Sequence, residues 1–236
     1  MEKERIRLYC AAALAAMTAF GCTTDEDGSL VIVQNQIPGT DCVIPPTPGT
    51  FRGRGQIDAQ STQGYLFTPV VKSLLVMDPK KFSDRVVAVE GADVDVEFPN
   101  GFFSSSEEAE LRSDRLTRFS QAFSGSVQPG GFTSFGFVVV PPGLLGRLAD
   151  VLGDGDSVEV TVEVVVFGDL GGGNVESSPF RYPIDVCDGC MKIDNGDCAS
   201  LGESFEPLEG GECNLLQDVP VDCCTAAGVE QCPAST

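Results

Sequence analysis

The chain of 236 residues carries 15 Lys and Arg against 35 Asp and Glu, a formal net charge of −20, and it contains no His. So acidic a surface repels nucleic acid and anionic lipid head groups, and we expect no nucleic-acid partner. The absence of His excludes Ser-His-Asp and Cys-His catalysis and all His-ligated metal sites.

The first 22 residues have the pattern of an export signal. The basic residues Lys3, Arg5 and Arg7 precede an apolar run over residues 8–20, which ends in Gly21 and Cys22. A basic head, a short apolar middle and a small residue at the cut are typical of a secretory signal. The run is shorter than the roughly 20 residues that a membrane-spanning helix needs. We therefore predict a signal peptide over residues 1–21.

The end of this signal, Ala-Phe-Gly-Cys at residues 19–22, resembles the lipobox of bacterial lipoproteins. The resemblance implies cleavage before Cys22, a diacylglyceryl thioether on its sulfur and an acylated amino group. Thr23 stands where Asp favours inner-membrane retention, so the resemblance implies the outer membrane. Residues 22–28 would then be an anchor and tether reaching about 20 Å at full extension. The alternative is an ordinary secreted protein in which Cys22 is one more cysteine.

The body of the chain reads as a series of strands. Residues 92–98 and 158–166 alternate apolar with mostly polar side chains, which predicts strands buried on one face. The Pro-rich residues 37–49 cannot sit inside a sheet, so we read them as an extended crossing segment. The expected strands, rich in β-branched and aromatic residues, are 30–33, 51–59, 65–76, 85–98, 116–126, 132–140, 157–167 and 177–186.

Two stretches break the strand pattern. Residues 141–152 place Leu144, Leu145, Leu148, Val151 and Leu152 at helical spacing after a Pro, which predicts one short helix. Residues 104–115 begin with a capping-box pattern and are either a surface helix or a loop. Together these patterns predict a mainly β fold, an antiparallel β-sandwich that is immunoglobulin-like in a loose sense, over residues 29–186.

Residues 187–236 form a Cys-rich tail, expected to be irregular and held by disulfides instead of a large core. Of the ten cysteines, Cys10 leaves with the signal and Cys22 is the proposed lipid site. An even number then remains for four disulfides: Cys42, Cys187, Cys190, Cys198, Cys213, Cys223, Cys224 and Cys232. Only one of the eight lies outside the tail, so full internal pairing requires a bond from Cys42 to the tail. The adjacent Cys223 and Cys224 should reach different partners.

Three motifs suggest chemistry, each beside a structural interpretation. Cys187-Asp-Gly-Cys190 has redox spacing, but it follows a strand among other cysteines, which favours a structural disulfide over a redox or zinc site. The acidic turns at residues 25–27, 154–156 and 194–197 offer oxygen ligands for calcium, although Asp and Gly are also ordinary turn formers. Arg52 and Arg54 form a small basic island that we interpret as strand surface. No Ser-x-x-Lys, Gly-x-Ser-x-Gly or phosphate-loop pattern is present.

As a whole, the chain resembles uncharacterised Cys-rich exported lipoproteins of Gram-negative bacteria, on the strength of residues 19–22, 30–42 and 187–232. The resemblance implies a location and no activity. We expect a non-enzymatic protein without a cofactor or metal site, anchored to the outer membrane by its N-terminal lipid. It would act through an envelope protein partner or in envelope structure. The alternatives are a calcium- or glycan-binding module and, less favoured, a thiol oxidoreductase or hydrolase.

Overall fold

The computed structural model describes residues 28–76, 86–202, 205–211 and 213–232. The predicted signal peptide, the predicted lipid site Cys22, the acidic turn at 25–27 and all but the last residue of the predicted tether lie outside these ranges. None of the helices within the described ranges has both the length and the apolar character needed to cross a bilayer.

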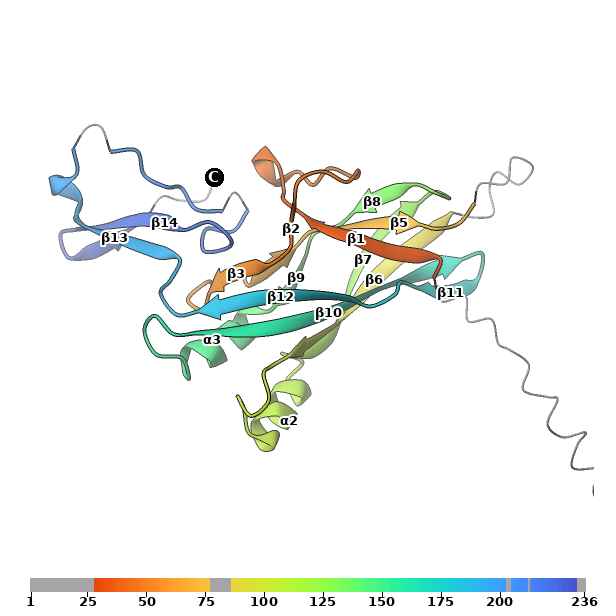
Figure 1. Ribbon diagram of the computed structural model, residues 1–236, viewed down its shortest axis with the longest axis horizontal. Coiled ribbons are helices and arrows are strands. Elements are labelled where there is room, and N and C mark those ends of the chain that lie inside the picture. Colours follow the sequence, from red (N-terminus) through yellow and green to blue (C-terminus); the bar gives the residue numbers. More distant parts are fainter. Residues whose placement is uncertain (1–27, 77–85, 203–204, 212, 233–236) are drawn as a thin grey trace, which may run out of the picture.

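Two sheets form the body (Figure 1). The four-stranded sheet has the order β2 (Phe51–Arg52), β1 (Leu30–Gln36), β5 (Pro69–Ser73) and β8 (Phe132–Ser134). The six-stranded sheet has the order β3 (Gly55–Asp58), β12 (Phe180–Cys187), β10 (Ser157–Leu170), β6 (Val87–Glu97) and β7 (Arg118–Val127), with β11 (Gly173–Glu176) paired to β10. A small sheet pairs β4 (Tyr65–Phe67) with β9 (Phe137–Val140).

The core lies between the two large sheets, and the predicted alternation produces it. Val160, Val162 and Val164 of β10 are fully buried, whereas the side chains between them point outward and are partly exposed. They pack in one cluster with Leu30 and Ile32 of β1. Because successive side chains of a strand point to opposite faces, every second residue faces the opposing sheet. The mainly β, sandwich-like fold is therefore confirmed.

The chain changes sheets where the prediction had one continuous strand at 65–76. β4 ends at Phe67 and β5 begins at Pro69, and the two strands belong to different sheets. Pro69 has no backbone N–H to continue the ladder. The backbone N–H of Thr68 instead donates to Asn35 Oδ1 at 2.9 Å, and its hydroxyl donates to the Gln36 carbonyl. The predicted strand at 51–59 is likewise divided, into β2 and β3.

Two helices pack on this body. The stretch left open between helix and loop is the helix α2 (Ser105–Ser113), and Ser104 and Glu107 form its capping box. The predicted second stretch is α3 (Pro142–Ala149), which buries Leu144, Leu145 and Leu148. The helix ends before Val151, which is 53% exposed, whereas Leu152 packs on the core as predicted. The prediction was therefore wrong for Val151 and for the length of the helix.

The tail is more regular than predicted. β13 (Lys192–Asp197), β14 (Val221–Ala226) and β15 (Val229–Gln231) form a three-stranded sheet. β13 pairs in parallel with β14, as β3 does with β12, so the fold is not wholly antiparallel. A small apolar cluster around Met191 and Val221 supports this sheet. Buried and exposed side chains do not alternate along β13. Its sequence therefore lacks the alternation of apolar and polar residues that predicts a strand. The tail sheet lies at the end of the long axis opposite the start of β1 (Figure 1).

Candidate functional site

The tail is attached to the body at one place, which we call the tail joint: residues 213–218 and the body residues that they contact. Cys213 forms a disulfide with Cys42 of the Pro-rich segment, which confirms that Cys42 bridges to the tail. Beside it, residues 216–218 lie along the outer edge of β3. Asp58 N donates to the Leu216 carbonyl at 3.1 Å, and Asp218 N donates to the Gln56 carbonyl at 2.8 Å. The tail thus covers a strand edge that would otherwise be unpaired.

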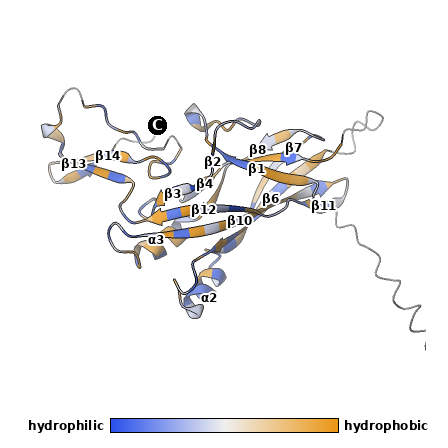
Figure 2. Ribbon diagram, viewed as in Figure 1, coloured by the Kyte–Doolittle hydropathy of each residue, from blue (hydrophilic) through white to orange (hydrophobic). Residues whose placement is uncertain are grey.

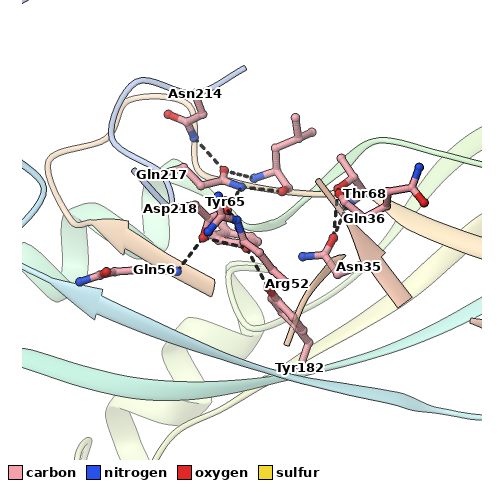
Figure 3. A network of polar contacts seen from close by, with 11 residues as sticks. Asn35, Gln36, Arg52, Gln56, Tyr65, Thr68, Tyr182, Asn214, Gln217 and Asp218 are labelled. Atoms are coloured by element: carbon pink, nitrogen blue, oxygen red, sulfur yellow. Dashed lines mark hydrogen bonds and ion pairs between the residues drawn. The ribbon is translucent and has the colours of Figure 1, made fainter. Parts of the chain in front are cut away.

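Asp218 is the centre of the joint (Figure 3). Its carboxylate accepts from Gln56 N at 2.9 Å, from the Tyr65 hydroxyl at 3.2 Å and from Gln217 Nε2 at 3.1 Å. It also forms an ion pair with Arg52 Nε at 3.3 Å, and its side chain is 11% exposed. Four donors from β2, β3, β4 and the tail therefore converge on one carboxylate.

The neighbouring amide side chains act as backbone substitutes. Gln217 Oε1 accepts from Leu66 N and Gln217 Nε2 donates to the Leu66 carbonyl, both at 2.8 Å. This is the pair of bonds that a partner strand would make with β4. Asn214 Oδ1 accepts from the Ser61 hydroxyl at 3.2 Å, and its amide donates to the Gly64 carbonyl. The joint is thus specific in register, because a one-residue slip of the tail would break all of these bonds.

Burial sets the protonation of the joint. It raises the pKa of the Asp218 carboxyl, against the opposing effects of the Gln56 N–H and Arg52. Burial also raises the pKa of the Tyr65 phenol and of the Tyr182 phenol. Both phenols therefore remain protonated. Their hydroxyls lie 3.2 Å apart and form a hydrogen bond in which either can be the donor. Among the described residues, no buried side-chain nitrogen or oxygen lacks a partner.

One cavity lies beside the joint and another lies beside α2. One of about 220 Å³ opens beside the joint between Arg52, Leu66 and Asp218. A larger one, of about 520 Å³, lies between α2 and the end of β6, where Asp95, Glu97 and Glu108 line it together with Phe98. Two of these acids have cationic partners on the outer face of the six-stranded sheet. Asp95 pairs with Arg118 at 3.1 Å, and Glu97 with Arg181 at 3.8 Å.

The Cys187-Asp-Gly-Cys190 motif is a disulfide directly after β12. Cys187 is buried and Cys190 is exposed. Beneath the loop, the fully buried Asp58 accepts from Gly189 N at 3.2 Å and from Met191 N at 3.1 Å. No helix begins here to lower a thiol pKa by its dipole, as a thioredoxin-like site requires. Asp58 and the disulfide together fix the point at which the chain leaves the sandwich for the tail.

The remaining cysteines form disulfides within the tail. Cys198 pairs with Cys224 and Cys223 pairs with Cys232, so the adjacent cysteines reach different partners, as predicted. Among the described residues, the group that brings three potential metal ligands together is Cys223, Glu230 and Cys232. Two of its three ligand atoms are the sulfurs of a disulfide, which removes the thiolates that a metal would need.

In the acidic turns, Asp carboxylates accept hydrogen bonds from backbone N–H groups. Asp156 Oδ2 accepts from Gly153 N at 3.3 Å, Asp194 Oδ1 from Gly196 N at 2.8 Å and Asp197 Oδ1 from Ala199 N at 3.0 Å. These are the local bonds by which Asp stabilises turns. These bonds give the carboxylates a structural role in the turns.

The joint was not predicted from the sequence. Arg52 and Arg54 were both interpreted as strand surface. Arg54 is indeed exposed and pairs with Glu159 and with Asp185, the latter at 2.6 Å. Arg52, however, points to Asp218 of the tail, 166 residues further along the chain. The signal that would have pointed to the joint is the position of Cys42, which places the tail against this end of the body.

No protein-family model matches the chain, and no curated protein matches it in sequence. The class that the fold and the joint define is a disulfide-stapled β-sandwich with an appended Cys-rich tail. Four disulfides indicate an oxidising, extracytoplasmic environment.

Proposed function

We propose that the chain is an exported lipoprotein of the outer membrane, anchored by lipid on Cys22, that acts without enzymatic chemistry by presenting its tail to an envelope protein partner. The observation that supports this most is the rigid attachment of the tail at the end of the body opposite the start of β1 (Figure 1). If Cys22 carries lipid, the body stands on a short tether and the tail is its far end.

The chemistry of the joint agrees with this proposal. Burial raises the pKa of Tyr65 and of Asp218, and these two side chains bond each other inside the joint, where Asp218 also pairs with Arg52. Shifted pKa values often mark catalytic sites, but structural networks shift them as well. Here each donor on Asp218 comes from an element that the tail must touch, so fixing the position of the tail accounts for the arrangement.

The proposal is tested by site-specific photo-cross-linking in the native envelope. A photoreactive residue replaces Val229 of the tail, which is 63% exposed, and in the control it replaces Arg181 on the outer face of the six-stranded sheet. We expect one stoichiometric adduct from the tail position and none from the control. The intact mass of the mature protein, expected to begin at Cys22 with added lipid, tests the anchor. A lipid-free mass, or equal labelling from both positions, would contradict the proposal.

A second candidate function, binding of calcium or a glycan, is favoured by the cavity beside α2, which is lined by three acids, Arg112 and the aromatic ring of Phe98. Calorimetric titration with calcium and with envelope oligosaccharides tests it. Heat of binding that disappears in a Glu108→Gln variant would support this candidate. Absence of heat together with an unchanged melting temperature would eliminate it. A thiol oxidoreductase is distinguished separately, because it requires that mild reductant open Cys187–Cys190.

A further inference from the structure

The described chain begins beside one end of the four-stranded sheet. β1 starts at Leu30, which is bridged to Ser177 after the β10–β11 hairpin. Leu74, just beyond β5, donates its backbone N–H to the Ser29 carbonyl at 2.9 Å. The end of β5 therefore lies directly beside the point at which the predicted tether joins the body (Figure 1).

The outward face of the sheet is apolar at this end. Val31, Lys72 and Phe132 are directly opposite one another on β1, β5 and β8, so their side chains share one face. Leu74 follows Lys72 by two residues, just beyond β5 and toward the tether, and it is 51% exposed. Val33 lies on the other side of this row, at the bulge of β1, and it is 40% exposed. Figure 2 shows the hydrophobic colour along this part of β1. We call these five residues the anchor-end patch.

The same face is covered at its other end. Val70 precedes Lys72 by two residues on β5 and is fully buried. Its cross-strand neighbour Ser134 donates its hydroxyl to the Ile44 carbonyl of the Pro-rich segment at 2.9 Å. Among the described residues, this face is therefore covered at Val70, whereas Leu74 beside the tether is exposed. An exposed apolar area of this kind marks an interaction surface.

We propose that the anchor-end patch rests on the lipid bilayer. The inference depends on the proposed lipid anchor, because residues 23–27 leave the body about 20 Å of reach from Cys22 at most. Aliphatic side chains and Phe132 would enter the boundary between head groups and acyl chains. Lys72 Nζ lies 5.4 Å from the Phe132 ring centroid in this structure. On the bilayer, the flexible Lys72 side chain would turn its ammonium toward lipid phosphates and leave its stem on apolar surface.

The net charge of −20 argues that this contact is hydrophobic and local. The rest of the surface repels anionic lipid, so the body should touch the membrane through the anchor-end patch and hold the tail away from it. This orientation leaves the tail facing outward, as the proposed function requires.

The absence of Trp from the chain permits a clean test. A Leu74→Trp variant of the full-length lipidated protein places a single fluorophore in the patch, and Val229→Trp in the tail is the exposed control. Both are reconstituted in vesicles of phosphatidylethanolamine and phosphatidylglycerol with brominated acyl chains. We expect a blue shift and loss of most of the emission for Leu74→Trp and neither change for Val229→Trp. Val33→Trp is a second reporter if the first variant folds poorly.

The other outcomes are informative. A lipidated protein whose patch Trp is not quenched would refute the contact and leave the anchor intact. An intact mass without lipid would refute the anchor and, with it, this inference. A blue shift that occurs without vesicles, depends on protein concentration and coincides with dimer sedimentation would replace the bilayer by a second copy of the chain. Equal quenching at both positions would show that the body has no fixed orientation.

Discussion

Replacing Cys42 and Cys213 by Ala should destabilise the protein far more than replacing Cys187 and Cys190. The first disulfide joins cysteines that are 171 positions apart in the sequence, and the second joins cysteines that are 3 positions apart. In the chain-entropy description, these loops correspond to about 5 and about 2 kcal/mol of stabilisation at 25 °C. The difference arises in the unfolded state, where the long bridge removes far more conformations. A loss of about 5 kcal/mol is comparable to the whole stability of many domains.

Urea unfolding of the mature protein, followed by circular dichroism, measures both effects. We expect the midpoint of the Cys42/Cys213 double variant to fall by on the order of 2 M, and the other midpoint to fall by less than half as much. Each variant must still contain three disulfides, which alkylation and mass measurement establish. Equal midpoint shifts would refute the reasoning, because they would mean that the length of the closed loop does not determine how much each disulfide stabilises the protein.

Three further predictions follow from the joint and from α2. The burial-raised pKa of Asp218 means that the folded state binds this proton more readily than the unfolded state. Stability relative to Asp218→Asn should therefore rise as pH falls from neutral through the folded pKa, and level off below the unfolded value near about 3.9. Urea midpoints across this range measure the difference, and a difference that shrinks on acidification contradicts the sign. Gly55→Ala should cost about 1–3 kcal/mol, because its Cβ would lie 2.5 Å from the Tyr65 hydroxyl oxygen, whereas Gly53→Ala meets open space and should be nearly neutral. Equal melting temperatures for these two variants would argue against tight packing there. Ser104→Ala should cost about 1 kcal/mol locally by removing one half of the capping box, and faster amide exchange confined to α2 would show it. Unchanged exchange would mean that the cap contributes nothing.

The parts of the fold that were predictable are those governed by local pattern. β10 alternates Val with mostly polar residues, so both its strand character and its buried face follow from the sequence. The capping-box pattern correctly marks Ser104 as the N-cap of α2, although the pattern alone leaves helix and loop as alternatives. The partner region of Cys42 follows from counting, since seven of the other cysteines lie in the tail. Each of these three inferences needs only residues that are close in sequence, or the count of cysteines in each part of the chain.

The joint and the tail sheet were beyond such reasoning. Asp218 meets Arg52 and Tyr65 only because the folded sheets bring β2, β4 and the tail together, and nothing local distinguishes it from the many other acids. Gln217 replaces a strand by bonding both backbone groups of Leu66, a role that any exposed Gln could have. β13 forms because β14 lies beside it, although its own residues show no strand period.

The distribution of the disulfides shows what each bond is needed for. The large core between the two sheets contains no disulfide within itself, so packing of its buried Val, Leu and Phe side chains suffices. The tail has a core of only a few residues and contains three internal disulfides. Its attachment combines a disulfide with a partly buried ion pair between Arg52 and Asp218. The two act differently. Asp218 and Gln217 determine where the tail sits, because their bonds exist in one register only. The Cys42–Cys213 bridge keeps the tail near that register when those bonds open. Breaking this bridge should therefore let the tail leave its register more often, in addition to lowering the free energy of unfolding of the whole protein.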